Sequence, residues 1–469
     1  MFMAIDKYKG QQYIYQNIYN EFKRMILDGR FKADEKLPSK RKLAEQLDVG
    51  INTITNSYEQ LLAEGYIYTQ ERKGYFVEAI TQFAGSGMEE YAFPEDLKEA
   101  PLANGNWLSF SHMTADVSAF PFSAWMKCGQ KAIANHKQEL SEIPHPQGPY
   151  QVRESIARMI ALSRGVICEP EQIVVGAGSQ LLVRQLMEMQ SQQTTAAVED
   201  PGYSRFYTLL RRMGINVNTV PIDNNGADVN GLEEKDIRFL FITPSHQFPT
   251  GNIMPISRRI EWLNWSARHP HRYIVEDDYD SEFKYETDHI PSLQSLDKHQ
   301  RVIYIGTFSK TILPGMRISY MVLPPEILRA YQNYHIDAMQ SSNILELYTL
   351  HYFIESGEYT KHLKRMNHYY EKKRKCLIQE LKQRFESNVT IDDIPAGLHF
   401  LARFQTSKTY DMVEKKAKEE KLEIYTIRRF TLERTLEMDN IVILTLGFAT
   451  IQEEEIPEAV DRLYRVIYA

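Results

Sequence analysis

Four short segments of this sequence carry side chains that could bind a phosphate group and bond covalently to an aldehyde. Residues 176–180, Gly-Ala-Gly-Ser-Gln, follow an apolar run and open a helical stretch, so their N–H groups and hydroxyls suit a phosphate. Residues 199–203 and 276–279 end two further apolar runs with acidic residues and a tyrosine, and residues 307–310 end a fourth with Thr-Phe-Ser-Lys. Because α/β proteins bind ligands beyond the carboxyl ends of their strands, we expect these segments to meet.

Each segment alone also has an ordinary explanation as a turn, a solvated strand end or a surface lysine. Together they match what pyridoxal phosphate requires. The Lys310 amine would form the Schiff base, an aspartate of the segment 276–279 would keep the pyridine nitrogen protonated, and Arg317 would bind the phosphate. The third glycine of a dinucleotide fingerprint is missing after 176–180, which disfavours a nicotinamide cofactor.

The elements that would position these residues form an α/β pattern from residue 107 to residue 469. Short buried runs alternate with helical stretches, which predicts a mostly parallel sheet. The runs that we interpret as strands are 173–175, 196–198, 239–242, 273–275, 302–305 and 318–322.

Residues 1–80 have a different pattern, that of a winged helix-turn-helix. Apolar residues at helical spacing predict helices over 13–28, 40–47 and 51–64, and residues 66–68 and 75–77 predict a hairpin with a basic tip. This region carries 12 Lys+Arg and 11 Asp+Glu, whereas the whole chain has a formal charge of -7. A local excess of basic residues suits contact with a phosphate backbone, although a solvated helix face would also explain it.

Residues 81–106 lack a sustained apolar period and contain Gly, Ser, Pro and acidic residues, which predicts an extended linker. Farther along, the basic run 372–375 lies in a long charged helical stretch. We interpret that run as a solvated helix face.

Composition excludes several classes of protein. The three cysteines, Cys128, Cys168 and Cys376, are widely spaced, which argues against a disulfide framework and a zinc site, and we expect no metal. No run approaches ~18 consecutive apolar residues, and the first thirty residues are polar. We therefore expect a cytoplasmic protein with no membrane span and no signal peptide.

These motifs resemble a known family. The spacing of Asp277, Tyr279, Ser309-Lys310 and Arg317 is similar to that of fold-type I, aspartate-aminotransferase-like proteins. Residues 37–77 resemble the GntR winged helix, and the fusion of the two resembles the MocR subfamily of GntR-type regulators. Within it, the similarity is greatest to regulators that respond to γ-aminobutyrate.

The resemblance implies a role for each matching residue. Lys310 would hold pyridoxal 5'-phosphate as an internal aldimine, Asp277 would pair with the ring nitrogen, Tyr279 would bond the ring hydroxyl oxygen, and Tyr203 would stack on the ring. The implied phosphate ligands are Ser179, Gln180, Thr307, Ser309 and Arg317. Arg205 and Arg429 would bind the effector's carboxylate. The implied DNA-binding residues are Ser39, Arg41, Asn52, Thr53, Arg72, Lys73 and Gly74.

The function implied is that of a homodimeric, domain-swapped transcription factor that binds promoter DNA. It would sense γ-aminobutyrate, or a similar ω-amino acid such as β-alanine or taurine, by external aldimine formation. It would activate γ-aminobutyrate catabolic genes and repress its own gene. The alternatives are a functional aminotransferase with an appended DNA-binding domain and a regulator with a vestigial, cofactor-free domain.

Three positions depart from the patterns of these families. Phe248 precedes Pro249 where aminotransferases carry asparagine, and Thr445 stands where a late strand usually carries the carboxylate-binding arginine. Both changes are consistent with a sensor that has lost efficient transamination. In the winged helix, Gly50-Ile51 replaces the Ser-Arg of many relatives, which removes a contact worth ~1–3 kcal/mol if that arginine read a base.

Overall fold

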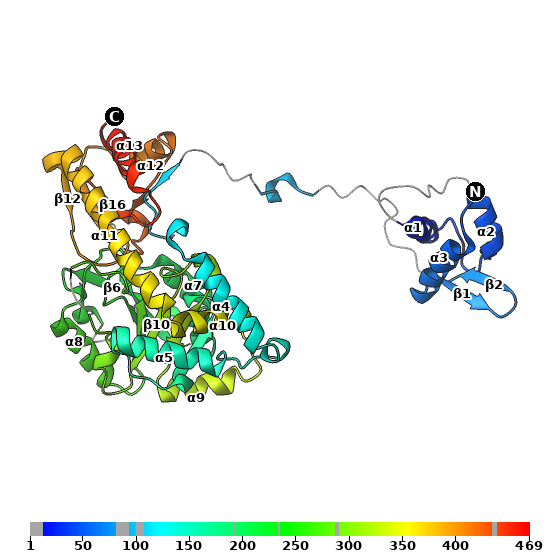
Figure 1. The fold of residues 1–469 in the computed structure, drawn as a ribbon, viewed down its shortest axis with the longest axis horizontal. Helices are drawn as coiled ribbons and strands as arrows, with labels where there is room; N and C mark the ends of the chain where they lie inside the picture. The colour runs from blue at the N-terminus through cyan, green and yellow to red at the C-terminus, as the bar shows by residue number, and fades with distance from the viewer. Residues whose placement is uncertain are drawn as a thin grey trace. The chain divides into compact units, whose positions relative to one another are not determined.

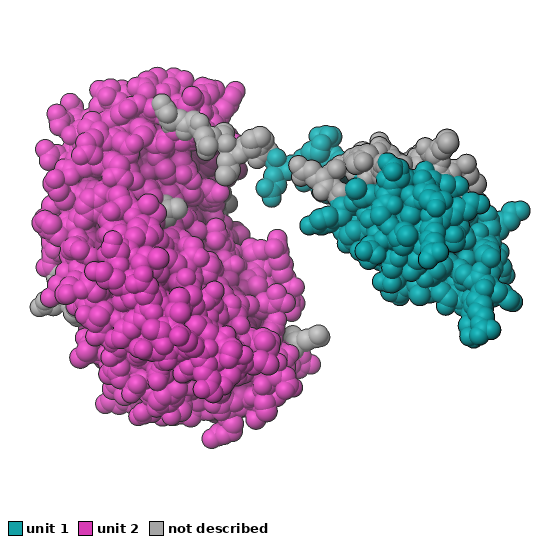
Figure 2. Space-filling model, turned by 45° about the vertical axis from the view of Figure 1, so that its right-hand side comes forward, with its two compact units in different colours: residues 1–102 teal, residues 103–469 magenta. Residues whose placement is uncertain are grey.

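The computed structural model describes residues 13–80, 93–99, 107–113, 115–191, 193–232, 235–286, 290–433 and 439–469. The chain divides into two compact units, residues 1–102 and 103–469 (Figure 2). Of the predicted linker 81–106, residues 81–92 and 100–106 lie outside the described part, and residues 93–99 contain one 3-10 turn at Glu95–Leu97. In the described part, no helix is long and apolar enough to cross a membrane.

The first unit contains the three helices and the hairpin that the apolar spacing predicts. They are α1 Ile14–Leu27, α2 Lys40–Leu47, α3 Ile51–Ala63, β1 Ile67–Gln70 and β2 Gly74–Val77 (Figure 1). Phe22 and Tyr58 lie at the centre of the core, with their rings 5.7 Å apart edge to face. The Ser39 hydroxyl accepts the N–H of Lys42 and so caps the start of α2.

The second unit is built on an eight-stranded sheet with the order β4-β11-β10-β9-β8-β5-β6-β7. Strands β10, β9, β8, β5 and β6 pair in parallel, and β11 pairs antiparallel with both β10 and β4. The mostly parallel sheet is as predicted. The strands are β4 Ile173–Gly176, β5 Thr195–Asp200, β6 Asn216–Asp223, β7 Gly226–Ala227, β8 Phe239–Ile242, β9 Tyr273–Asp278, β10 Val302–Thr307 and β11 Ser319–Val322.

Helices cover both faces of this sheet because its strands are apolar on both sides. One set of helices packs with Trp125 and Phe353 against Tyr304 of β10, and the other packs with Phe206 and Tyr331 against Ile303. The first set is α4 Phe122–Asn135, α5 Tyr150–Arg164 and α10 Ile344–Glu355. The second set is α6 Ser179–Glu188, α7 Ser204–Arg212 and α9 Pro325–Tyr334, and α8 Ile256–Ala267 packs on a neighbouring apolar cluster.

A smaller antiparallel sheet with the order β12-β13-β16-β15 forms the C-terminal part of this unit. Its strands are β12 Val389–Ile391, β13 His399–Gln405, β15 Tyr425–Thr426 and β16 Ile441–Gly447. The helices around it are α11 Glu358–Phe385, α12 Tyr410–Glu419 and α13 Ile456–Tyr468. The short strand β3, Leu108–Ser109, pairs in parallel with β14, Leu422–Glu423, so the beginning of this unit packs against its end.

The basic run 372–375 on α11 corrects one prediction. Lys373 and Arg374 are 0% and 3% exposed, not solvated. Lys373 belongs to the inward face of the helix, where its ammonium donates to Asp116 at 2.7 Å. Arg374 bonds Asp393. The prediction treated all four residues alike because they form one run of like charges. The two outer lysines of the run are indeed exposed and pair with surface glutamates, whereas the two inner residues face the core.

Burial opposes ionisation of Asp116, but hydrogen bonds from Lys373, Ser118 and Tyr369 hold the pKa of its carboxyl below the ordinary value. Burial also lowers the pKa of Lys373, and the contact with Asp116 counteracts that effect. The two groups therefore form a buried ion pair in the core of the unit.

Candidate cofactor and effector site

The carboxyl ends of β4, β5, β9 and β10 bring the four predicted segments together. A cavity of about 260 Å³ lies at these ends. All nine residues predicted to bind the cofactor line it, and so does Arg205. The lining residues are His112, Met113, Gly178, Ser179, Gln180, Tyr203, Arg205, Phe248, Asp277, Tyr279, Thr307, Ser309, Lys310, Pro314 and Arg317.

One end of the cavity is built to bind an anion. Gly178 has φ 108°, and helix α6 starts at the next residue, so unpaired N–H groups of the first helical turn lie at this end. A Cβ on Gly178 would lie 2.1 Å from a terminal nitrogen of Arg317, so only glycine lets that guanidinium come so close. The Thr307 hydroxyl accepts the N–H of Ser309 at 3.1 Å, which orients the loop after β10.

Lys310 follows β10, and its ammonium donates to the carbonyl oxygen of His112. Burial lowers the pKa of Lys310 to about 8, an effect that Asp280 opposes and Arg205 reinforces. A substantial fraction of this amine is therefore neutral near pH 8, which is the nucleophilic form.

Asp277 lies on β9 with its carboxyl facing the cavity. Burial, followed by the charges of Asp278, Glu199 and Asp280, raises its pKa to about 8. Among the described residues, none donates a hydrogen bond or forms an ion pair with this carboxyl. The ionised form of such a buried, unpaired carboxyl would be stabilised by a cationic partner, such as a protonated ring nitrogen.

Aromatic rings form the walls of the cavity. The Tyr203 hydroxyl accepts from the Gln180 amide at 3.3 Å, which holds the ring at the cavity edge. Phe248 packs edge to face against Tyr203 at 5.9 Å and against Tyr279 at 5.8 Å. It therefore gives this side of the cavity an apolar surface.

The two arginines predicted to bind the effector differ in position. Arg205 lines the cavity, whereas Arg429 does not. The Arg429 guanidinium lies 4.9 Å from the Tyr425 ring centre, and that ring lies 4.9 Å from the ring of His112. Arg429 is therefore not a lining residue but lies near one, because its charge lowers the pKa of the lining residue His112. A joint carboxylate clamp stays a prediction.

The predicted DNA-binding residues of the first unit are mostly exposed. Arg41 lies on α2, Asn52 lies on α3, and Arg72 and Lys73 lie in the turn between β1 and β2, where Arg72 has φ 60°. Among the described residues, no carboxylate forms an ion pair with any of these three cations. Ser39 and Gly74 are exposed as well, and Thr53 is half-buried.

The family comparisons divide the chain in the same way as its geometry. Residues 14–77 match the model of bacterial regulatory proteins of the gntR family, and residues 105–463 match that of aminotransferases of class I and II. The HTH-type transcriptional regulator YdeL of Bacillus subtilis (strain 168) is 36% identical over 451 residues, which cover 96% of each chain. The probable rhizopine catabolism regulatory protein MocR of Rhizobium meliloti is 29% identical, covering 96% of this chain and 93% of its own. This chain belongs to the MocR-type GntR regulators.

Solved structures show the same fold for the larger unit of this MocR-type regulator. Pyrococcus horikoshii kynurenine aminotransferase superposes with a TM-score of 0.69 at 21% identity and covers 78% of this chain and 91% of its own. Thermus thermophilus α-aminoadipate aminotransferase LysN superposes with a TM-score of 0.68 at 24% identity and covers 77% and 92%. The prediction of an aminotransferase-like fold joined to a winged helix is confirmed.

Pyridoxal phosphate is the cofactor of the class I and II aminotransferase fold, and the cavity of this MocR-type regulator fits it. The buried Asp277 carboxyl lacks a partner, and Lys310 is an amine of lowered pKa. The close approach of Gly178 to Arg317 completes a phosphate cradle.

Sequence reasoning missed His112, Met113 and Pro314 among the lining residues. His112 is 4% exposed, and burial, followed by the charges of Lys310, Arg429 and Arg205, lowers its pKa to about 3. It follows β3, a two-residue strand that pairs with a segment about 300 residues away. No local motif signals this position, so the sequence offered no way to find it.

The structure also shows the surroundings of two positions that depart from the family patterns. Thr445 is fully buried on β16, and its hydroxyl has no hydrogen-bond partner among the described residues. Ile51 is 48% exposed at the first position of α3, the predicted recognition helix. An exposed apolar side chain there cannot replace an arginine's bonds to a phosphate or a base edge.

Proposed function

We propose that this MocR-type regulator uses its aminotransferase-like unit as a sensor of γ-aminobutyrate or a similar ω-amino acid. The main support is the content of the cavity. It contains Lys310, Asp277 and the phosphate cradle, and it is also lined by Phe248, at the position where the resemblance to aminotransferases implies an asparagine. Such a site can hold the cofactor and an amine while lacking an amide that efficient turnover uses.

The bound cofactor supplies an aldehyde carbon that can exchange one amine partner for another. Lys310 is prepared for that exchange by its lowered pKa, and the carbonyl of His112 accepts its N–H when the amine is free. Arg205 binds the carboxylate of the effector from the cavity lining, and Arg429, which lies near the lining residue His112, joins it in the bound state. The effector changes promoter binding only as far as it favours one conformation of the protein over another.

On the DNA side, Ser39, Arg41, Asn52, Thr53 and the turn at 72–74 contact the promoter. The regulator activates genes for γ-aminobutyrate catabolism and represses its own gene. β-Alanine and taurine are the competing effectors, because an arginine pair specifies an acidic group but not its distance from the amine.

We propose that the regulator is a homodimer with DNA-binding units exchanged on the segment 81–106. Support comes from α4, where Phe122, Met126 and Ile133 are 46%, 61% and 47% exposed. Their spacing places them on one side of the helix. A second copy of this chain would cover that apolar stripe.

The deciding experiment is a time course of visible absorbance after γ-aminobutyrate is added to the holoprotein. We expect a spectral shift that then holds, because the effector's amine replaces Lys310 without further reaction. Arg205→Ala should weaken the response to γ-aminobutyrate, whereas Arg212→Ala, an exposed change at the end of α7, should leave it unchanged.

Steady conversion to the pyridoxamine form, with release of the keto product, would contradict the sensor and support the aminotransferase alternative. Parallel titrations with β-alanine and taurine identify the effector. A spectrum that stays unchanged with all three would contradict the proposed class of effector but not the presence of the cofactor.

A further inference from the structure

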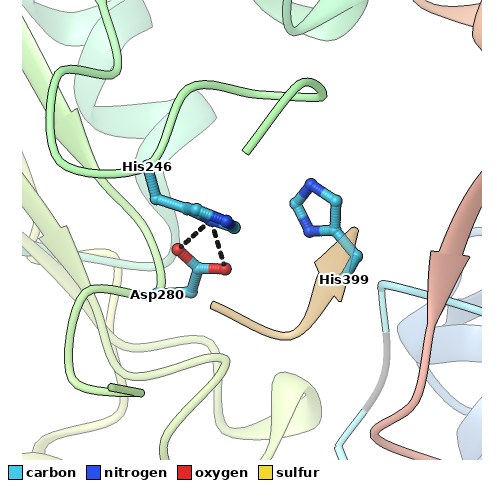
Figure 3. Close-up of side chains that lie close together, drawn as sticks. All are labelled: His246, Asp280 and His399. Atoms are coloured by element: carbon cyan, nitrogen blue, oxygen red, sulfur yellow. Dashed lines mark hydrogen bonds and ion pairs between the residues drawn. The ribbon is translucent and has the colours of Figure 1, made fainter. Parts of the chain in front are cut away.

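Tyr279 lies between the cavity and a buried pair of side chains that the cofactor roles above leave unused. His246 lies on the loop after β8, and Asp280 directly follows Tyr279. They are 2% and 1% exposed. Figure 3 shows the His246 ring bonded to the Asp280 carboxylate, with His399 at the start of β13 beside it.

The bonds at one nitrogen of His246 determine where a proton lies. Its Nδ1 is 3.0 and 3.1 Å from the two carboxylate oxygens of Asp280 and 2.9 Å from the hydroxyl oxygen of Tyr279. A carboxylate can only accept, so Nδ1 must carry the proton that bonds it. Nδ1 then has no lone pair for Tyr279, and the hydroxyl proton of that tyrosine is left to point into the cavity.

The surroundings hold this geometry in place. The N–H of Leu398 donates to Asp280 at 3.2 Å. Gly397 has φ 69°, and a Cβ there would lie 2.0 Å from a carbon of the His246 ring. His399 packs 4.9 Å from that ring and bonds the carbonyl oxygen of Pro249. The backbone thus approaches the pair more closely than any side chain would allow.

We propose that Asp280 and His246 are positioning residues that fix the Tyr279 hydroxyl as a hydrogen-bond donor toward the cavity. The inference rests on the proposed function and on the role that the family resemblance implies for Tyr279, a bond to the ring hydroxyl oxygen of the cofactor. Asp280 fixes the tautomer of His246, so that His246 offers the Tyr279 hydroxyl no lone pair at Nδ1. Among the described residues no other hydrogen-bond acceptor contacts this hydroxyl, which leaves its proton for the ligand. The same logic orients catalytic histidines through a carboxylate partner.

Several other charged groups face Tyr279. Burial raises the pKa of its hydroxyl well above 10, and the carboxyls of Asp280, Asp277, Glu199 and Asp278 raise it further. The hydroxyl therefore keeps its proton throughout the working pH range. His399 contributes no charge, because burial and the neighbouring histidines and Lys310 lower its pKa well below 6.5.

Two imidazoles and a carboxylate are also a donor set for a transition metal. In His246, Asp280 and His399 the candidate ligand atoms lie within 4.8 Å of one another. The hydrogen bonds already made by His246 Nδ1 and by His399 favour the tautomer-fixing role instead. A zinc titration is therefore one arm of the test.

The first test uses the cofactor-free protein and ¹⁵N-labelled histidine. We expect the His246 Nδ1–H proton at low field, because a bond to a carboxylate is charge-assisted, and we expect Asp280→Asn to move it upfield. An unprotonated Nδ1 would overturn the proposal whether or not Lys310 binds the cofactor. Stoichiometric Zn²⁺ that displaces this proton at low micromolar concentration would overturn it in favour of a metal site.

The second test titrates the visible absorbance of the lysine-bound cofactor against pH. Tyr279→Phe should raise the pH at which this chromophore loses its proton, because a donor to the ring oxygen stabilises the deprotonated form. His246→Leu should raise this pH as well. His246→Asn keeps an N–H near the position of the histidine's Nδ1 and should therefore titrate close to the wild-type pH.

The double variant His246→Leu/Tyr279→Phe separates a positioning role from a structural one. If His246 acts through Tyr279, the double variant should titrate like Tyr279→Phe alone. Equal shifts from His246→Leu in both backgrounds would overturn the proposal. A holoprotein that never forms the lysine-bound chromophore would contradict the proposed function and leave the result of the first test standing.

Discussion

Basic side chains occupy opposite environments in the two units of this chain. In the winged-helix unit, Arg41, Arg72 and Lys73 are exposed, and among the described residues no carboxylate pairs with them. In the larger unit, Lys373 is fully buried against Asp116, and Lys310 lies in the cavity with a lowered pKa. Counts of charge along the sequence would treat these residues alike. Their surroundings suit them to three different roles: the DNA contact that we propose for the exposed cations, core packing for Lys373, and the covalent chemistry that we propose for Lys310.

The largest effect that this comparison predicts is at Lys310. Lys310→Ala should abolish covalent attachment of pyridoxal phosphate, because we propose its amine, which lines the cavity and has a lowered pKa, as the nucleophile, while unfolding of the cofactor-free protein should change little. Visible absorbance of the reconstituted protein measures attachment, and Lys298→Ala, an exposed change on the same unit, is the control. Wild-type absorbance in the alanine variant would contradict the assignment of the nucleophile.

The buried pair on α11 should respond next most strongly. Lys373→Ala leaves Asp116 buried without its cation and should lower the free energy of unfolding by about 3 kcal/mol. Lys372→Ala is the matched control, because this neighbour is exposed and pairs with the surface residue Glu453, and it should change stability by less than about 0.5 kcal/mol. Chemical denaturation measures both, and equal losses would show that the burial of Lys373 does not matter.

The pH dependence of cofactor attachment distinguishes Lys310 from an exposed lysine. Its pKa of about 8 lies below the usual 10.5, so the amine is mostly neutral above pH 8 and protonated below it. The rate of attachment should therefore rise roughly tenfold per pH unit up to about pH 8 and then level off. Stopped-flow absorbance tests this expectation. A rate that keeps rising to pH 10 would mean that burial does not lower this pKa.

The exposed cations of the winged unit should produce the smallest change. Arg72→Ala should weaken promoter binding by about 1 kcal/mol and reduce the slope of log affinity against log salt by about one, with no loss of stability. Lys23→Ala is the control, since Lys23 already pairs with Glu64 at 3.6 Å. Fluorescence anisotropy at several salt concentrations gives the slopes, and an unchanged slope for Arg72→Ala would remove the turn from the DNA interface.

The sequence predicted those candidate site residues that stand at the ends of strands. Asp277, Lys310 and Ser179 sit at the ends of apolar runs, so the sheet brings them together as expected. It did not predict His112, which reaches the cavity only through the distant pairing of β3 with β14. The error at Lys373 had another cause, because a run of like charges hid the helical period that turns this lysine inward.

The contact between Gly178 and Arg317 has a consequence for how such a regulator could lose its cofactor. One added methyl group at Gly178 would occupy the space of the guanidinium, although every chemically active side chain would remain. A single nucleotide change in a glycine codon can introduce alanine. An alanine there would be strained at φ 108° and would push the Arg317 guanidinium aside, so a lineage could weaken its hold on the phosphate in one mutation while its sequence still carried the lysine, the aspartate and the tyrosines of the proposed sensor.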